Sequence, residues 1–334
     1  MTSAKAKAVV TGGAGFIGSH LVERLLAAGH SVLVLDNFST GRPENLAHLR
    51  RDPRLSVERV DVANDSQLPA RLDGANWVFH LAALADIVPS MERPLDYHRA
   101  NVDGTVAVLE AARQAGVHRF IYAASSSCYG IPDRYPTPET APSRPQYPYA
   151  LTKLLGEHCV LHWGQVYRLP VVSLRLFNVY GPRSRTSGTY GAVFGVFLAQ
   201  KLAGRPYTVV GDGNQSRDFT FVSDVVDAFV TSAEASVAGE AFNVGTGSPV
   251  SVNRLTALLK GDAVHIPSRP GEPTRTHADI AKIQHHLGWR PKVSIDEGIG
   301  ILLDNIESWR QAPVWTPETI HVATRDWFRY LGKE

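Results

Sequence analysis

A glycine-rich segment that follows a short apolar run is the feature that most constrains the fold. Residues 9–20 have the sequence VVTGGAGFIGSH, in which Gly13, Gly15 and Gly18 match G-x-G-x-x-G, and Gly12, Gly15 and Gly18 match the related G-x-x-G-x-x-G. We expect a first strand to turn into a helix here. Because glycine has no side chain, backbone N–H groups and the helix N-terminus can approach a pyrophosphate. The segment therefore predicts a dinucleotide-binding turn.

Apolar runs alternate with helix-length amphipathic segments over the first half of the chain. Strands are expected at residues 8–12, 31–36, 56–61, 77–83, 119–125 and 171–176, with helical segments at 18–28 and 91–115 among them. This alternation is typical of an α/β fold with a doubly wound parallel sheet covered by helices on both faces. From about residue 177 the pattern becomes irregular and rich in Gly and Pro, so we expect a smaller C-terminal substrate-binding domain there.

Asp36 ends the second apolar run, one strand after the glycine segment. A carboxylate in that place can accept hydrogen bonds from the hydroxyls of an adenosine ribose. It would repel a 2′-phosphate, because both groups are negatively charged. We therefore predict NAD as the cofactor in preference to NADP.

A tyrosine and a lysine lie four residues apart in the sequence YALTK, residues 149–153. On a helix, Tyr149 and Lys153 share a face and can point into one cleft. A lysine ammonium about 5 Å away would lower the pKa of the phenol by roughly two units at an effective dielectric near 20. Tyr149 is thus a candidate general base for a sugar or alcohol hydroxyl. Ser125 ends the run RFIYAAS and could relay the proton or hold the reacting oxygen.

Composition excludes several other classes of function. The 334 residues carry a net charge of +2 without a run of like charges, so no nucleic-acid partner is expected. The two cysteines indicate a reducing compartment, and the absence of a long apolar run argues against a membrane span. A cytoplasmic protein is the expectation. His285 and His286 are adjacent and would diverge on a helix, and we predict no metal site.

Ten motifs in order give the chain a clear resemblance to a known family. They are TGGAGFIG, LDNFSTG, RVDV, HLAAL, NVDGT, the serine stretch AASSSCYG, YALTK, RLFNVYGP, GDGNQSRDF and SRPGEP. The chain resembles extended short-chain dehydrogenases/reductases of the nucleotide-sugar epimerase and dehydratase group, most of all UDP-hexose 4-epimerases. The resemblance implies a seven-stranded Rossmann-like sheet, a tightly bound NAD and a homodimer formed by the helices in 91–115 and 149–167.

The resemblance also implies domain limits and cofactor contacts. Residues 1–176, with some later segments, would form the NAD-binding domain, and 177–310 the substrate-binding lobe. Residues 311–334 extend past where the resemblance fades and are rich in aromatic side chains, so we expect this C-terminal extension to pack on the protein's own surface or on a second subunit. The expected cofactor contacts are Gly12, Gly15, Phe16, Ile17, Gly18, Asp36, Asn37, Ser39, Thr40, Gly41, Asp61, Val62, Leu81, Ala82, Ala83, Asn101, Tyr149 and Lys153.

Differences between the serine stretch of this chain and that of related enzymes limit the reactions that we expect. Dehydratases of this group carry Asp and Glu in the serine stretch, where this chain has Ser126 and Ser127, and decarboxylases tend to have Glu at the place of Ser127. A 3,5-epimerase would place a Cys there, one position before Cys128. The reaction that remains, epimerisation at C4, needs only Tyr149 and Ser125 as acid/base groups. In it, hydride leaves C4 of the sugar for NAD, the 4-keto sugar rotates, and hydride returns to its other face. We predict a C4 epimerase of a UDP-linked hexose.

Substrate contacts are carried over from the same resemblance. The expected residues are Ser125, Ser126, Tyr149, Asn178, Arg185, Val193, Arg217, Arg269, Glu272 and Thr276. Arg217 and Arg269 would clamp the diphosphate, for which a guanidinium is well suited. Glu272 would receive the nucleotide ribose, and Asn178 would contact sugar or phosphate.

The identity of the sugar stays open at this point. Thr276 lies where strict glucose/galactose epimerases carry a bulky Tyr, and the loop 187–194 resembles that of epimerases acting on UDP-N-acetylglucosamine. Arg185 resembles an arginine of uronate epimerases that can meet a carboxylate. Hexose, N-acetylhexosamine and uronic acid are all possible. A net oxidoreductase, decarboxylase or dehydratase of the same family, or a protein that only binds NAD, are the alternative functions.

Overall fold

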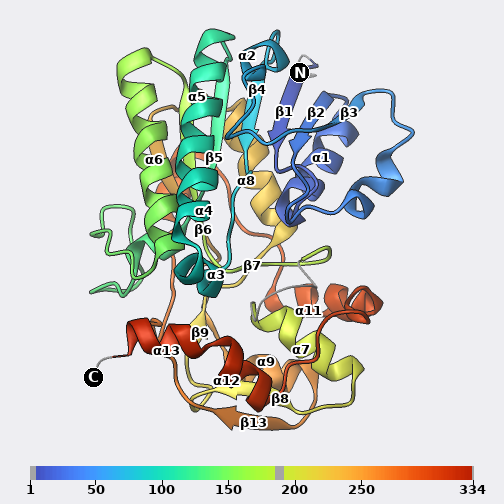
Figure 1. Ribbon diagram of the computed structural model, residues 1–334, viewed down its shortest axis with the longest axis vertical. Coiled ribbons are helices and arrows are strands. Elements are labelled where there is room, and N and C mark those ends of the chain that lie inside the picture. Colours follow the sequence, from blue (N-terminus) through green and yellow to red (C-terminus); the bar gives the residue numbers. More distant parts are fainter. Residues whose placement is uncertain (1–4, 185–191, 333–334) are drawn as a thin grey trace.

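The computed structural model describes residues 5–184 and 192–332. A parallel sheet of seven strands forms its upper part, with the strand order β11-β6-β5-β4-β1-β2-β3 (Figure 1). Its strands are β1 (Lys7–Thr11), β2 (Ser31–Asp36), β3 (Leu55–Arg59), β4 (Trp77–His80), β5 (Arg119–Ser125), β6 (Val171–Leu176) and β11 (Glu240–Val244). The predicted doubly wound Rossmann-like fold is confirmed, and each strand expected from the sequence is present.

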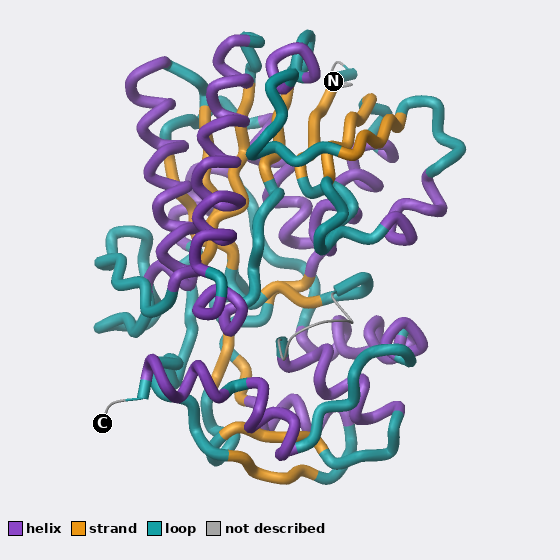
Figure 2. Tube along the Cα trace, in the orientation of Figure 1, coloured by secondary structure: helices purple, strands orange, loops and turns teal. Residues whose placement is uncertain are grey.

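The remaining elements cover the sheet or build the lower part of the molecule (Figure 2). The helices are α1 (Phe16–Ala27), α2 (Leu68–Arg71), α3 (Ile87–Glu92), α4 (Pro94–His98), α5 (Gly104–Gln114), α6 (Pro148–Tyr167), α7 (Val193–Leu202), α8 (Val222–Glu234), α9 (Val252–Leu259), α10 (Ala281–Leu287), α11 (Ile295–Asp304), α12 (Pro317–Ala323) and α13 (Arg325–Leu331). Short helical turns are η1 (Pro43–Leu49), η2 (Arg99–Asp103), η3 (Ser126–Tyr129) and η4 (Ile306–Trp309). The short strands are β7 (Val179–Tyr180), β8 (Tyr207–Val210), β9 (Ser216–Arg217), β10 (Thr220–Phe221), β12 (Val250–Ser251) and β13 (Ala263–Ile266).

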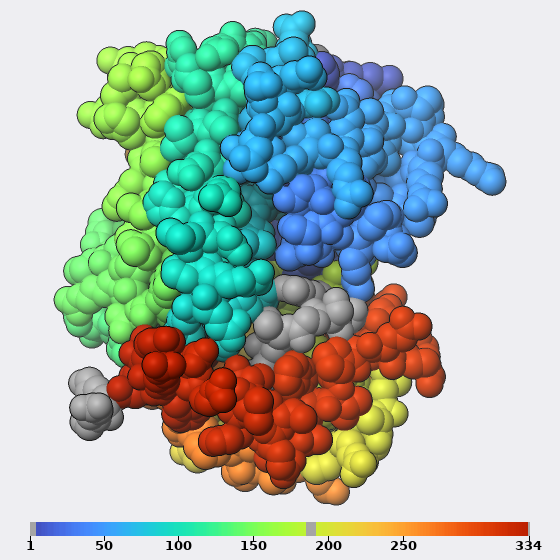
Figure 3. Space-filling view, in the orientation of Figure 1, coloured from blue at the N-terminus to red at the C-terminus, as the bar shows by residue number. Residues whose placement is uncertain are grey.

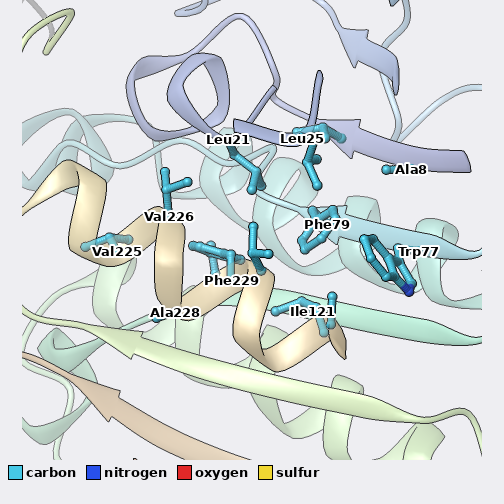
Figure 4. Close-up of a cluster of buried hydrophobic side chains, with 14 of the residues drawn as sticks. Ala8, Leu21, Leu25, Trp77, Phe79, Ile121, Val225, Val226, Ala228 and Phe229 are labelled. Atoms are coloured by element: carbon cyan, nitrogen blue, oxygen red, sulfur yellow. The ribbon is translucent and has the colours of Figure 1, made fainter. Parts of the chain in front are cut away.

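Two apolar layers hold the helices on opposite faces of the sheet. On one face, α1 and α8 pack on the sheet through side chains such as Leu21 and Phe229 (Figure 4). On the other face, α5 and α6 pack on it through side chains such as Val108 and Val160. Every residue of β4 and β5 is buried, as expected for strands covered on both sides. The rigid sheet fixes the ends of its strands, where the site lies.

The segment 91–115 is not one helix, as the sequence suggested, but a series of shorter ones. Helix α3 ends at Glu92, and α4 begins at Pro94, which occupies the first position of the helix. Proline has no N–H to donate and its ring disfavours the helical conformation of the residue before it, so it ends one helix and starts the next. The break leaves α3 free to pack beside α13.

The lower part is a smaller C-terminal lobe around its own apolar core. It contains α7, α9, α11, α12 and α13 with the small sheets β13-β8 and β12-β9. Its core is aromatic: the rings of Tyr180 and Phe194 stack at 4.7 Å, and those of Phe197 and Tyr207 at 4.9 Å. Trp309 is fully buried in the same core.

Candidate functional site

A cavity of about 400 Å³ lies between the carboxyl ends of the sheet strands and the C-terminal lobe. In an open parallel sheet, ligands bind at this edge. Most of the predicted cofactor residues line the cavity. They are Gly12, Gly15, Phe16, Ile17, Gly18, Asp36, Asn37, Ser39, Thr40, Gly41, Asp61, Val62, Leu81, Ala82, Ala83, Tyr149 and Lys153.

The glycine turn is shaped by contacts that a side chain would prevent. Gly12 has φ +69°, and a Cβ there would lie 2.8 Å from the backbone N of Ala82. A Cβ on Gly18 would collide with the carbonyl oxygen of Gly12. Helix α1 starts just after Gly15, without a side-chain cap or an acidic residue in its first turn among the described residues. Its N-terminus therefore suits a negatively charged pyrophosphate.

Asp36 ends β2 in the cavity wall and ties the two sides of the turn together. Its carboxylate accepts hydrogen bonds from the backbone N–H of Ala14 at 2.9 Å and of Phe38 at 2.8 Å. Burial raises the pKa of Asp36, and these two hydrogen bonds oppose that shift. A Cβ on Gly41 would lie 2.7 Å from Oδ2 of Asp36, so only glycine lets the chain pass so close. The residues present thus fit an NAD molecule.

Asn101 lies behind the cavity wall instead of lining it. Its Oδ1 accepts from the backbone N–H of Leu84, and its Nδ2 donates to the carbonyl of Leu84 and to Oγ1 of Thr152. Leu84 itself lines the cavity. In this structure Asn101 supports the cavity wall and joins it to helix α6, and a contribution to cofactor binding would be indirect.

Tyr149 and Lys153 lie in the first turns of α6 and line the cavity, and the Tyr149 phenol makes a hydrogen bond with Ser125, the last residue of β5. Burial raises the pKa of Tyr149, while a hydrogen bond with Ser125 lowers it and the charge of Asp86 raises it. Burial lowers the pKa of Lys153 to about 7, and Glu157 opposes that shift. The ammonium lies 4.2 Å from the centre of the Tyr122 ring.

The expected lowering of the Tyr149 pKa by Lys153 is therefore wrong for the protein alone. Both groups are buried, and removal from water disfavours the charged form of each. The sequence places the pair on one helix face, but it does not tell how much water reaches them.

Asp86 is a carboxylate in the cavity that the sequence analysis missed. It is the residue before α3, and it lies close enough to Tyr149 for its charge to raise the phenol's pKa. The available signal was its position in HLAALAD, three residues after Ala83. Loops that follow parallel strands gather at one edge of the sheet, so this acid could have been expected near the end of β5.

Arg217, Arg269 and Glu272 converge in the C-terminal lobe although up to 55 residues separate them. Nη2 of Arg217 donates to Oε1 of Glu272 at 2.8 Å, and Nη1 of Arg269 lies 3.8 Å from Oε2 of the same carboxylate. The side chains of Arg217 and Arg269 are 11% and 12% exposed. Two cations held this close to one anion can accommodate a further negative group.

Thr276 and Asn178 form a hydrogen-bonded pair. Oγ1 of Thr276 donates to Oδ1 of Asn178 at 2.8 Å and accepts from the backbone N–H of Asp218. Asn178 has φ +25°, a conformation that few non-glycine residues adopt. Thr276 thus holds Asn178 in place, in addition to any role as a small gate residue.

The other predicted substrate residues are less closely gathered. Ser126 is half-buried at the start of η3, and Val193 is partly buried against the core of the C-terminal lobe beside Phe194, which lines the cavity. Arg185 and most of the loop 187–194 lie outside the described residues. Tyr180, Arg183 and Trp315 also line the cavity and were not predicted. Tyr180 belongs to the motif RLFNVYGP and Arg183 follows it directly, so their position in the sequence was an available signal, whereas no motif contains Trp315.

A model of the "NAD dependent epimerase/dehydratase family" matches residues 8–245, well over half of the chain. The chain belongs to this family. It is therefore an NAD-dependent enzyme, and the predicted relationship and cofactor are confirmed. Within residues 5–184 and 192–332, the structure has no cluster of three or more His, Cys, Asp or Glu placed to hold a metal. Nor does any helix in those ranges combine the length and apolar character needed to cross a membrane.

Individual family members with high similarity have different activities. UDP-glucose 4-epimerase of Mycolicibacterium smegmatis is 40% identical over 303 residues, which cover 88% of this chain and 96% of that protein. UDP-glucuronic acid decarboxylase 1 of Arabidopsis thaliana is 35% identical, covering 87% of this chain and 67% of the relative. A solved structure, UDP-glucuronic acid 4-epimerase from Bacillus cereus in complex with UDP-glucuronic acid and NAD, is 33% identical, with a TM-score of 0.84 over 90% of this chain and 99% of that one.

Proposed function

We propose that this enzyme is a C4 epimerase of a neutral UDP-linked hexose, either glucose/galactose or their N-acetylamino forms. The observation that carries the proposal is the pair Tyr149 and Lys153 in the wall of the NAD cavity, with Ser125 hydrogen-bonded to the phenol. The serine stretch beside it has Ser126 and Ser127 where a dehydration would need acid and base groups. The 40% identical relative is named a UDP-glucose 4-epimerase.

Tyr149 would remove the proton from the C4 hydroxyl of the sugar and return it after the transient 4-keto sugar has rotated. When bound, NAD supplies the hydride acceptor and donor at C4, and its positively charged nicotinamide ring favours the tyrosinate. Ser125 already makes a hydrogen bond to the phenol and can hold the reacting oxygen between them. Lys153, one turn further along α6, would favour the deprotonated phenol in its charged form.

The diphosphate of the substrate would lie against Arg217 and Arg269. The side chains of both arginines are nearly buried and face Glu272. A guanidinium donates paired N–H groups to phosphate oxygens, which suits this role better than a surface ion pair would. Glu272 would accept hydrogen bonds from the nucleotide ribose, as the family resemblance implies.

Asp86 favours a neutral sugar over a uronic acid. Its carboxylate lines the same cavity as Tyr149 and raises the pKa of the phenol through its charge. The carboxylate of a uronic acid would be repelled by that of Asp86, because like charges interact strongly in a site with little water. A neutral hexose can instead donate a hydroxyl to Asp86.

UDP-glucuronate 4-epimerisation and decarboxylation are the second candidates, because relatives with each of these activities are 33% and 35% identical to this chain. Decarboxylases of the group tend to have Glu where this chain has Ser127. Here Ser127 donates its backbone N–H to Oγ of Ser125 at 3.2 Å, and its side chain makes a hydrogen bond to Tyr147. Ser127 thus supports Ser125 and Tyr147 through hydrogen bonds, and it brings no carboxylate to the site.

The test incubates purified enzyme, with no added cofactor, separately with UDP-glucose, UDP-N-acetylglucosamine and UDP-glucuronate. Proton NMR then resolves the products. We expect an equilibrium mixture of 4-epimers from a neutral sugar. Epimerisation of UDP-glucuronate alone would refute the argument from Asp86, and net oxidation, decarboxylation or loss of water would refute the 4-epimerase itself. The variant Asp86→Asn should accept UDP-glucuronate better than the wild type does.

We also propose a cytoplasmic homodimer. Leu95 on α4, a helix that packs beside α6, is 80% exposed, and Leu151 and Val166 on α6 are also exposed. Two free cysteines fit a reducing compartment. Light scattering should find a dimer that Leu151→Glu converts to a monomer. Val322→Glu, at an exposed position on α12, should leave the dimer intact.

A further inference from the structure

The C-terminal segment, residues 311–332, runs along the C-terminal lobe toward the sheet domain. It contains α12 and α13 and is coloured red in Figure 1. In Figure 3 the segment lies across one face of the lobe and borders the teal region of α3 and α4, and α13 packs on α3. It begins far beyond residue 245, where the match to the family model ends. Its contacts are nevertheless with residues of the candidate site.

Trp327 on α13 contacts the loop that carries Arg269. Its indole Nε1–H donates to the carbonyl oxygen of Pro270 at 2.7 Å, and the guanidinium carbon of Arg269 lies 5.5 Å from the centre of its ring. Trp327 is only 4% exposed. A cation over an aromatic face within about 6 Å is attracted by the ring, more strongly when water is excluded. The indole therefore holds both the backbone of the loop and the arginine side chain.

The backbone of the same loop also passes close to Leu331. Gly271 has φ +70°, and a Cβ there would lie 3.5 Å from Leu331, four residues after Trp327. Glycine can adopt this left-handed conformation without strain, which turns the chain tightly against α13. The loop from Arg269 to Glu272 is thus packed against one face of the helix.

Trp327 also borders the catalytic region. Its ring lies 6.2 Å from that of Tyr147, which in turn stacks nearly parallel to Tyr149 at 6.4 Å. At the start of the segment, Trp315 lines the cofactor cavity, and its carbonyl oxygen accepts from Nε2 of Gln200. Both ends of the C-terminal segment therefore reach the site.

From these contacts we propose that Trp327 is a positioning residue for the nucleotide-sugar substrate. The indole holds Arg269 and its loop in the arrangement that receives the diphosphate, while Trp327 itself does not touch the reacting atoms. This inference rests on the proposed function, because it takes Arg269 as a diphosphate ligand. Loss of the indole should weaken nucleotide binding and leave the cofactor site unchanged.

The experiment measures binding of UDP to the NAD-containing enzyme by calorimetry. Trp327→Ala should raise the Kd for UDP about tenfold, whereas Trp327→Phe, which keeps a ring but loses the N–H donor, should raise it about threefold. Tyr330→Ala removes an exposed ring from the same helix and should bind UDP like the wild type. Thermal unfolding and NAD content of each variant check that the fold is retained.

A double-mutant cycle separates positioning from general support of the fold. In the background Arg269→Ala, adding Trp327→Ala should raise the Kd for UDP by about threefold or less instead of tenfold, because the part of its effect that passes through the arginine is already lost. An equal loss in both backgrounds would overturn the proposal, and so would unchanged UDP binding by Trp327→Phe and Trp327→Ala in the wild-type background. Failure of the wild type to bind UDP would instead overturn the proposed function, and with it the ligand assigned to Arg269.

Discussion

The cofactor side of the site, which lines the cavity, and the proposed substrate side in the C-terminal lobe are built in different ways. On the cofactor side, the turn at Gly12–Gly18 and the carboxylate of Asp36 lie within 25 residues and belong to two neighbouring strands. On the substrate side, Arg217, Arg269 and Trp327 come from segments far apart in the chain. The first arrangement follows from local backbone requirements, whereas the second exists only when the C-terminal lobe is folded. The two sides should therefore respond differently to substitution.

The largest effect is expected at the residue where the two sides meet. Tyr149→Phe should lower kcat by at least ~10³-fold, because the sugar hydroxyl loses its general base. NAD content should stay unchanged, since the aromatic ring remains. Tyr147→Phe is the matched control, two residues away in the same region, and should lose less than about tenfold. Steady-state rates and the absorbance of bound cofactor measure both. Near-normal turnover of Tyr149→Phe would contradict the mechanism.

The cofactor side should be sensitive to a single added methyl group. In Gly18→Ala the new Cβ would meet the Gly12 carbonyl, so we expect a loss of about 3 kcal/mol in unfolding free energy together with weaker NAD binding. Gly300→Ala adds the same group on α11, where no atom lies within 4 Å. That control should gain about 0.5–1 kcal/mol, because alanine favours the helix. Denaturant unfolding and NAD titration check both variants. Equal stability of the two would refute the packing argument.

The substrate side should lose affinity for substrate while the cofactor stays bound. Arg217→Ala should raise the KM for the UDP-sugar by ~10- to 100-fold, through loss of charge-assisted hydrogen bonds. Arg254→Ala removes another arginine of the same lobe, one that forms an exposed ion pair with Asp296, and should change KM less than about twofold. If both variants raised KM alike, a general electrostatic effect would replace the proposed contact.

The smallest predicted effect concerns pH and the buried Lys153. Its folded pKa is about 7 against the ordinary 10.5, so between these values the unfolded chain binds more protons than the folded one. The free energy of unfolding of the cofactor-free enzyme should therefore rise by up to about 1.4 kcal/mol as the pH increases from 7.5 to 8.5. Lys153→Met should lack this rise. Urea unfolding at several pH values measures it.

Lys292 provides a control for the pH dependence attributed to Lys153. The pKa of Lys292 is raised by its hydrogen bond to Asp227, so its titration lies above the range used. Lys292→Met should show the same slope as the wild type. A rise of stability with pH in Lys153→Met equal to that of the wild type would mean that other groups cause it.

The fold and the cofactor side could be predicted because their signals are local. The spacing of the strand-like runs predicts the sheet. The spacing of the glycines and of Asp36 predicts the cofactor site, and the structure places nearly all of the predicted cofactor residues in one cavity. Burial could not be predicted in the same way, and the expected direction of the Tyr149 pKa was wrong for that reason. Asp86 and Trp327 were missed because their neighbours are distant in sequence.

The position of Glu272 affects which anions the enzyme can bind. It lies between Arg217 and Arg269 and cancels part of their charge before any ligand arrives. A small anion such as inorganic phosphate must compete with this built-in counter-ion and gains little by doing so. In the proposed substrate complex, a nucleotide diphosphate would bring additional contacts through its ribose and base, and Glu272 would turn toward the ribose hydroxyls. Discrimination against the abundant free phosphate of a cell would thus depend on an acidic residue inside a basic site.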